Sequence, residues 1–168
     1  DALNSLEGVK GRAEVVPCDR DFTIIIDYAH TPDGLENVLK TAREITPETG
    51  KLICIFGCGG DRDKSKRPEM AAIAVKYATI AILTSDNPRT ESPTAILDDM
   101  IAGITEATNY LRITDRSEAI RTAAVLAHAG DIILIAGKGH EDYQIIGTEK
   151  FHFDDREQIR NAFELAHN

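Results

Sequence analysis

The feature that most constrains the fold is a regular alternation of short apolar runs with amphipathic segments. From about residue 22 onward, β-branched apolar runs typical of buried strands alternate with segments whose apolar residues recur at helical spacing. The expected strands cover residues 22–27, 51–56, 80–84, 110–114 and 131–136. This pattern predicts an α/β fold: a three-layer, mostly parallel, Rossmann-like sheet of about six strands, with helices on both faces and right-handed crossovers.

Turn and capping residues support the expected helix starts. Thr31, Pro32 and Asp33 offer an N-cap, a proline at the first helical position and an acid in the first turn. Asp115 and Asp154 are each followed three residues later by glutamate, as in a capping box. These signals predict that a helix follows each expected strand or turn.

Two further predictions concern the ends of the chain. Residues 143–146 and 149–153, separated by Gly147 and Thr148, are expected to form a C-terminal hairpin. The chain begins at Asp1 without a methionine, so we expect a fragment of a longer chain. We assign residues 1–20 to a hinge or linker and residues 21–168 to the domain itself.

Composition excludes several classes of protein. The 42% hydrophobic and 28% charged residues are ordinary for a globular protein. A net charge of −9 argues against nucleic acid or an anionic membrane as partner. No apolar run reaches the roughly 20 residues that span a bilayer, and three cysteines without metal-binding spacing indicate reduced thiols. We therefore expect a cytoplasmic location.

Ligands of parallel α/β sheets bind at the carboxyl ends of the strands, so four loops are candidates for a site. The first contains Asp27, Tyr28 and His30. These side chains could be half of a catalytic dyad, half of a metal site, or polar groups at the start of a helix. From the residues alone, the last interpretation is favoured.

The second loop, residues 57–68, is rich in glycine and cations but fails both nucleotide motifs. Asp63 occupies the place of the glycine that a Walker A loop requires before Lys-Ser. Arg62 occupies the place of the last glycine of the dinucleotide fingerprint, which argues against a dinucleotide-dependent oxidoreductase. The loop suits carboxylate or phosphate binding, and a solvated charged turn explains it equally well.

The third loop presents an acid, an amide and a guanidinium in a stiff tetrapeptide. Pro88 restricts both its own backbone and that of Asn87, between Asp86 and Arg89. This set matches a ligand with both ammonium and carboxylate groups. An ordinary turn into the following helix is the alternative, and the residues alone slightly favour it.

The fourth loop also combines glycines with charged side chains. Gly137 and Gly139 permit close approach of a ligand to the backbone, and Glu141 could pair with an ammonium group. His140 stands where a phosphate loop needs serine or threonine. On its own, this histidine is more often structural than catalytic.

Taken together and in order, these loops resemble those of the Mur ligases. The matching stretches are GR at 11–12, DYAHTPDGLENVL at 27–39, FGCGGDRDKSKRPEM at 56–70, SDNPRTESP at 85–93 and AGKGHEDYQ at 136–144. The resemblance implies a three-domain, ATP- and Mg²⁺-dependent amide ligase of peptidoglycan synthesis, of which this chain is the C-terminal domain. That domain closes over ATP and brings the incoming amino acid, so the fragment alone would hold no catalytic residue, no metal site and no activity.

The resemblance also implies partners and reaction. The partners are ATP, a UDP-N-acetylmuramoyl dipeptide, the incoming amino acid, and the N-terminal and central domains of the same parent chain. In the family, the glutamate γ-carboxylate of the dipeptide is activated as an acyl phosphate, which the amine of the incoming amino acid attacks.

The DNPR tetrapeptide looks like the signature of members that add meso-2,6-diaminopimelate. By resemblance, that amino acid would bind at Arg62, Asp86, Asn87, Pro88, Arg89, Gly137 and Glu141. The nucleotide would contact Arg12, Asp27, Tyr28 and His30, while Lys138 is assigned to neither ligand.

The chemistry of the amino acid agrees with this assignment. Diaminopimelate is lysine with an additional distal carboxylate, and arginines are rigid bidentate partners for such a group. An L-lysine-adding relative, which an acidic or neutral residue at position 89 would favour, is one alternative. A non-catalytic small-molecule-binding α/β module is the other.

Overall fold

The computed structural model describes residues 13–167 and confirms the expected α/β architecture. Its central six-stranded sheet has the order β1-β2-β6-β3-β4-β5, and only β1 runs antiparallel to its neighbour. The strands are β1 (Glu14–Val16), β2 (Thr23–Asp27), β3 (Leu52–Cys58), β4 (Ile80–Ser85), β5 (Tyr110–Arg112) and β6 (Ile132–Ala136). Arg12 lies outside the described residues.

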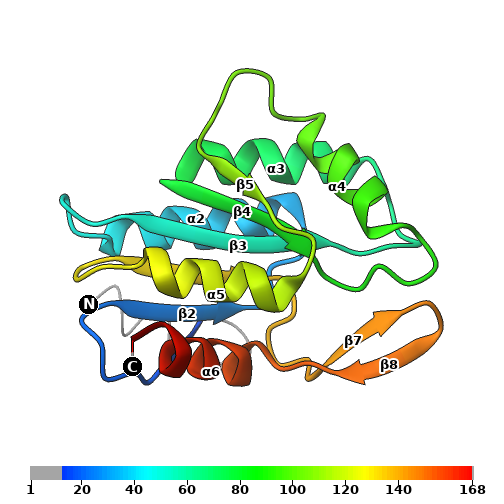
Figure 1. The fold of residues 1–168 in the computed structure, drawn as a ribbon. Coiled ribbons are helices and arrows are strands. Elements are labelled where there is room, and N and C mark those ends of the chain that lie inside the picture. The colour runs from blue at the N-terminus through cyan, green and yellow to red at the C-terminus, as the bar shows by residue number, and fades with distance from the viewer. Residues whose placement is uncertain (1–12, 168) are drawn as a thin grey trace.

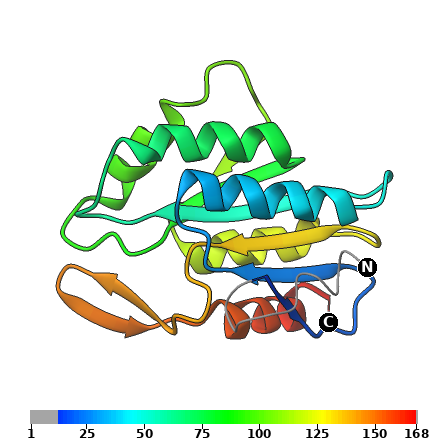
Figure 2. The same cartoon turned by 180° about the vertical axis from the view of Figure 1, so that it is seen from behind.

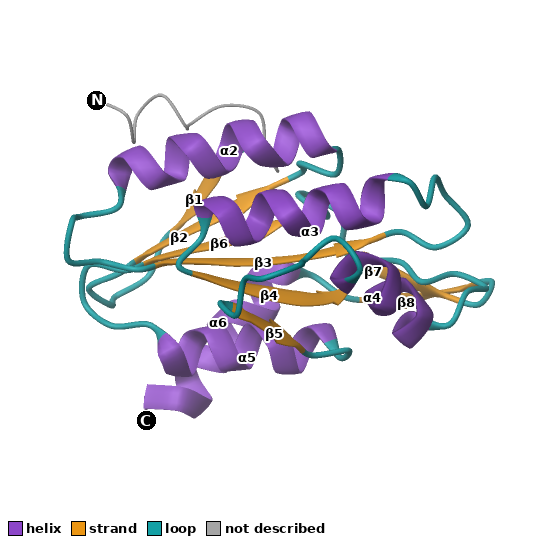
Figure 3. Cartoon of the chain, turned by 90° about the horizontal axis from the view of Figure 1, so that it is seen from above, coloured by secondary structure: helices purple, strands orange, loops and turns teal. Residues whose placement is uncertain are grey.

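Helices cover both faces of this sheet, as Figures 1 and 3 show. On one face lie α2 (Pro32–Ile45), α3 (Lys66–Tyr77) and α4 (Pro93–Ile101). On the other lie α5 (Arg116–Leu126) and α6 (Asp155–His167). No helix within residues 13–167 is long and apolar enough to cross a membrane.

Two apolar clusters, one on each face of the sheet, form the core. In β2, Ile25 belongs to the cluster that contains residues of α2, α3 and α4, whereas Ile24 and Ile26 belong to the cluster that contains residues of α5 and α6. Successive strand residues point to opposite faces, so a strand buried on both sides must be apolar throughout. This requirement explains the continuous apolar runs of the sequence.

Local capping sets the helix starts as predicted. The Thr31 side chain accepts a hydrogen bond from Gly34 N, and the Asp115 side chain accepts bonds from the amides of Ser117 and Glu118. Both caps satisfy amides that have no partner within their own helix.

Part of the predicted hinge belongs to the sheet. Glu14, Val15 and Val16, which lie within the range 1–20, pair with residues 24–26 as an antiparallel edge strand. Residues 14–16 are therefore part of the sheet of the domain. That residues 1–20 act as a hinge stays a prediction.

A two-stranded hairpin, β7 (Tyr143–Ile146) and β8 (Glu149–His152), projects from the body at the carboxyl edge of the sheet (Figures 1 and 2). It is attached to the loop after β4. Arg89 N donates to Ile145 O at 3.0 Å, and Gly147 N donates to Arg89 O at 2.7 Å. The hairpin thus fixes the backbone on both sides of a candidate site residue.

A fully buried ion pair lies beneath the same edge. The Arg116 guanidinium forms two bonds to the Asp155 carboxylate, at 2.9 and 2.8 Å, which join α5 to α6. Arg116 Nη1 also donates to Ser85 O, the last residue of β4, at 3.0 Å. The pair therefore supports the strand end from which the third loop departs.

We expect Asp155→Ala to destabilise the domain strongly, because it leaves the Arg116 guanidinium buried and unpaired. The loss should be about 3–5 kcal/mol, which lowers Tm by on the order of 10 °C in a thermal melt. Glu118→Ala, which removes the exposed pair with Arg121, is the control and should change stability by less than about 0.5 kcal/mol. Equal melting of both variants would contradict the assigned role of the buried pair.

Candidate functional site

The loops after β2, β3, β4 and β6 surround one cavity of about 380 Å³. It lies at the carboxyl edge of the sheet, where parallel α/β folds bind ligands. The lining residues are Tyr28, His30, Gly57, Cys58, Gly59, Arg62, Asp63, Lys66, Arg67, Met70, Asp86, Asn87, Arg89, Gly137 and Glu141. Six of the seven residues predicted to bind the amino acid line this cavity, and Pro88 does not.

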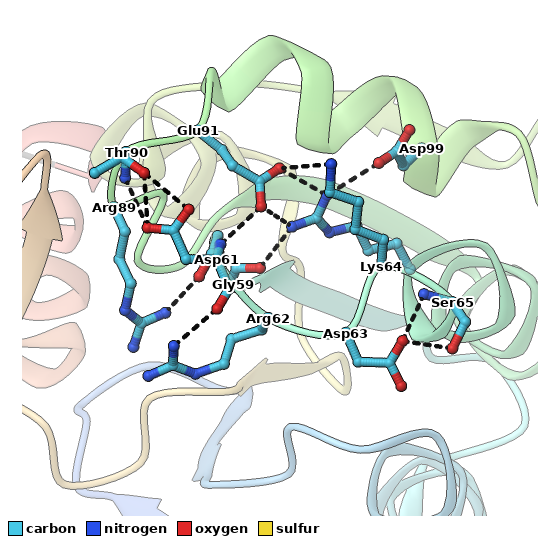
Figure 4. A network of polar contacts seen from close by, with 12 residues as sticks. Gly59, Asp61, Arg62, Asp63, Lys64, Ser65, Arg89, Thr90, Glu91 and Asp99 are labelled. Atoms are coloured by element: carbon cyan, nitrogen blue, oxygen red, sulfur yellow. Dashed lines mark hydrogen bonds and ion pairs between the residues drawn. The ribbon is translucent and has the colours of Figure 1, made fainter.

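Arg62 and Arg89 approach each other across the glycine-rich loop. A Cβ atom added at Gly59 would lie 3.0 Å from Arg89 Nη1 and 3.6 Å from Arg62 Cγ. The guanidinium of Arg62 donates to Asp61 O at 2.9 Å, and that of Arg89 donates to Gly60 O at 3.0 Å (Figure 4). Neither arginine forms an ion pair with another residue between positions 13 and 167, so both retain capacity for an anionic ligand.

Asp86 and Asn87 are held from behind by a buried lysine. Lys138 Nζ lies 3.1 Å from Asp86 Oδ1 and donates to Asn87 Oδ1 at 2.8 Å. Asn87 Oδ1 also accepts a bond from Ile145 N at 3.0 Å. The acid and the amide of the tetrapeptide are thus oriented by the protein before any ligand arrives.

Lys138 and Glu141 face each other more loosely, with Nζ and Oε1 3.9 Å apart. Burial lowers the pKa of Lys138, although the nearby Asp86 carboxylate opposes this shift. Burial also raises the pKa of Glu141, and Asp86 adds to that effect while Lys138 opposes it. A ligand ammonium beside Glu141 would counter this rise by favouring the ionised carboxylate.

Pro88 contributes through its backbone. A Cβ atom at Gly60 would stand 1.8 Å from Pro88 O, so only glycine permits this approach of the second and third loops. Gly60 N also donates to Asn87 O at 2.8 Å across the same junction. Pro88 therefore shapes the site from outside the cavity.

Three of the four residues predicted to contact the nucleotide line this cavity or a second hollow beside it. The Tyr28 and His30 rings lie 4.7 Å apart between centroids and reach the main cavity. Asp27, Tyr28 and His30 also line an adjoining hollow of about 240 Å³. The Asp27 carboxylate accepts bonds from Ala13 N and Ala29 N, so it also organises the backbone of this loop.

The described residues offer no cluster of side chains that could bind a metal ion. Positions 13–167 contain no group of three or more His, Cys, Asp or Glu side chains that could hold a metal ion. Burial raises the pKa of Cys58, in the cavity wall, to about 12, and Asp86 adds to the rise. This thiol is therefore protonated at neutral pH and is a poor nucleophile or metal ligand.

Sequence reasoning missed the buried charges that organise these loops. No sequence pattern singled out Arg67, Glu91 or Arg116, and Lys138 was left unassigned. Arg67 and Glu91 join the second and third loops. The carboxylate partners of Arg67, Arg116 and Lys138 lie 24 to 52 positions away, a separation that no local pattern reveals.

The arrangement is suited to a zwitterionic small molecule. The guanidinium groups of Arg62 and Arg89, which have no ion-pair partner in the described chain, line the same hollow as the Glu141 and Asp86 carboxylates. The cations would bind carboxylates and the acids would bind ammonium groups. The geometry supports recognition of an amino acid with more than one charged end.

Proteins of similar sequence come from two distant bacteria. The chain is 59% identical over 163 residues to UDP-N-acetylmuramoyl-L-alanyl-D-glutamate–2,6-diaminopimelate ligase of Thermosynechococcus vestitus. It is 60% identical over 160 residues to the ligase of the same name from Bacillus cereus. These matches cover 96% and 95% of this chain and 32% of each relative, so the chain spans about a third of their length.

Solved structures agree with the sequence match. A structure of a ligase with the same name superimposes with a TM-score of 0.88 and 47% identity, covering 98% of this chain and 33% of that chain. A murein peptide ligase from Psychrobacter arcticus shares the fold, with a TM-score of 0.67 at 17% identity over 96% of this chain and 31% of that one. The family model described as "Mur ligase, glutamate ligase domain" matches residues 11–139. The chain therefore belongs to the Mur ligase family.

Proposed function

We propose that this chain is the amino-acid-binding domain of an ATP-dependent ligase that adds meso-2,6-diaminopimelate to UDP-N-acetylmuramoyl-L-alanyl-D-glutamate. The observation that carries the proposal is that Arg62, Arg89 and Glu141 line one cavity. The names of the two relatives support the same substrate. Peptidoglycan synthesis in the cytoplasm is part of the proposal.

The two arginines account for the choice between diaminopimelate and lysine. A distal carboxylate can accept bidentate hydrogen bonds from a guanidinium. Lysine lacks that group, and its binding would enclose an unpaired arginine at a penalty on the order of 3–5 kcal/mol. Sites built around such a polar partner can reject the analogue that lacks it by roughly 10⁴-fold.

The acidic side of the cavity would hold the ammonium groups. Glu141 is the more available acid, because Lys138 lies 3.9 Å from it but only 3.1 Å from Asp86. We assign Glu141 and the Asp86 side chain to orient an amine of the amino acid. Asn87 and Gly137 complete the wall between them.

The nucleotide and the other substrates would meet this domain at its rim. Tyr28 and His30 line both hollows, which supports a nucleotide lying beside the amino acid. We include Arg12 among the residues that contact the nucleotide, on the basis of the sequence resemblance alone. ATP would activate the glutamate γ-carboxylate as an acyl phosphate, and the oriented amine would attack it. ATP and Mg²⁺ would be held mainly by the central domain of the parent enzyme.

A lysine-adding relative is the second candidate for the substrate. It is disfavoured by Arg89, whose guanidinium has no carboxylate partner among residues 13–167 and faces the cavity. A stand-alone binding module is disfavoured by the 60% identity to a ligase.

The substrate assignment is tested by phosphate release from the full-length parent enzyme, with meso-diaminopimelate and L-lysine offered separately. We expect kcat/KM to favour diaminopimelate by on the order of 10³ to 10⁴, because only its distal carboxylate pairs with the arginines. Equal use of the two amino acids would refute the assignment.

Arg89→Ala in the parent enzyme should chiefly weaken use of diaminopimelate. We expect KM for this amino acid to rise at least about thirtyfold, since a charge pair loses one partner. KM for ATP should be unchanged in the same steady-state assay. Arg112→Ala, which removes an exposed pair with Asp98, is the matched control. Normal diaminopimelate kinetics in Arg89→Ala would exclude the role of this guanidinium.

The isolated 168-residue chain should not hydrolyse ATP. Both of its glycine loops lack the phosphate-loop pattern, with Asp63 and His140 at the decisive positions. A malachite-green assay at high protein concentration checks this expectation. ATP hydrolysis that persists after repeated purification would contradict the proposal that the central domain of the parent enzyme is needed for it.

A further inference from the structure

The two loops that carry the cavity arginines are joined by a polar network, drawn in Figure 4. We call Asp61, Arg67, Thr90 and Glu91 the loop clasp. Arg67 donates from Nη1 to Glu91 Oε2 at 3.0 Å and from Nη2 to Glu91 Oε1 at 2.9 Å. Arg67 Nη2 also donates to Gly59 O at 2.9 Å. One guanidinium therefore holds both loops at once.

The clasp closes through a second set of bonds. Asp61 N donates to Glu91 Oε1 at 2.7 Å, which ties the second loop to the third. In return, the Asp61 carboxylate accepts bonds from Thr90, at 2.8 Å from Oγ1 and 3.2 Å from the amide. The bonded residues directly precede Arg62 and directly follow Arg89. The clasp thus controls the backbone from which each guanidinium extends.

Backbone conformation shows what the clasp must restrain. Asp61 and Arg89 have φ values of 54° and 52°, and Ala13 is the one other non-glycine residue with positive φ between positions 13 and 167. Non-glycine residues remain in this region only when the surrounding structure over-determines them. The clasp bonds supply that restraint at Asp61, and the clasp together with the β7–β8 hairpin supplies it at Arg89.

Arg67 and Glu91, the central charges of the clasp, are paired within the protein. The Arg67 side chain is 1% exposed and is paired with both Glu91 and Asp99. The hydrogen bond from Arg67 lowers the pKa of Glu91 to about 2, so the carboxylate stays ionised throughout the neutral range. Arg62 and Arg89 have no such partner in the described chain and face the cavity.

We propose that Glu91, clamped by Arg67, is a positioning residue that sets amino-acid selectivity by making Arg62 and Arg89 converge on one carboxylate. Glu91 does not line the cavity and acts through the two arginines. The inference rests on the proposed function, because it assumes that the two guanidinium groups bind the distal carboxylate. It assigns the selectivity of the site to a residue outside it.

The test is Glu91→Gln in the full-length parent enzyme, which keeps the shape of the side chain and removes its charge. We expect KM for meso-diaminopimelate to rise on the order of tenfold, the usual scale for disrupting a coupled polar network. KM for ATP and kcat at saturation should stay within about twofold. The weak use of L-lysine should not change, since lysine lacks the distal carboxylate that these arginines would bind. The preference for diaminopimelate over lysine should therefore fall about tenfold.

Thr90→Val provides a second variant that leaves the Arg67–Glu91 pair intact. It removes the hydroxyl bonds to Asp61 while keeping a β-branched side chain, and it should shift the same preference in the same direction. If Glu91→Gln does not fold, Thr90→Val tests whether the clasp sets the preference for diaminopimelate over lysine. Asp98→Asn, which weakens the exposed ion pair between Asp98 of α4 and Arg112 of β5, is the control and should leave all constants unchanged.

The outcomes separate this inference from the proposed function. If Arg89→Ala does not affect diaminopimelate kinetics, the proposed function fails. If Arg89→Ala raises KM but neither Glu91→Gln nor Thr90→Val changes the preference, the positioning role is overturned and the substrate assignment stands. A uniform loss of kcat and of affinity for every substrate would also overturn it, because that result indicates a purely structural role.

Discussion

Three buried cations, each neutralised by carboxylates, organise the carboxyl edge of the sheet. Arg116 pairs with Asp155 beneath the strand ends, Lys138 pairs with Asp86 behind the third loop, and Arg67 pairs with Glu91 between the second and third loops. All three side chains are at most 1% exposed. A charge at such depth destabilises the protein unless it is paired and hydrogen-bonded. The positions of the loops after β3, β4 and β6 therefore depend on where these pairs form.

This constraint separates two kinds of arginine in one small region. Arg67 and Arg116 have carboxylate partners and serve the structure, whereas Arg62 and Arg89 reach only backbone carbonyls and face the cavity. A site that binds a multiply charged amino acid needs both kinds. The paired arginines keep the loops in place without competing for the ligand, and the unpaired ones remain available to a carboxylate. On the proposed function, selectivity would depend on groups that do not line the cavity.

Agreement between sequence and structure is highest for local features. The buried strands, the Thr31 and Asp115 caps and the hairpin were all predicted, because each follows from neighbouring residues and their spacing. Six of seven expected amino-acid contacts share one cavity, since loops that follow parallel strands meet at one edge. Pro88, the seventh, does not line that cavity. Its contribution is a backbone contact with Gly60, which no sequence pattern describes. The roles of these residues toward a ligand stay predictions.

By itself, the sequence determined the layered α/β fold, the edge of the sheet that carries the cavity and the residue types offered there. Hydrophobic periodicity and turn chemistry act over a few residues, so they can be read along the chain. Only the tertiary structure decided which charges neutralise each other. The carboxylate partners of Arg67, Arg116 and Lys138 lie 24, 39 and 52 positions away, and burial alone makes their pairing compulsory. Only the folded protein therefore distinguishes arginines with a carboxylate partner, such as Arg67, from arginines without one, such as Arg89.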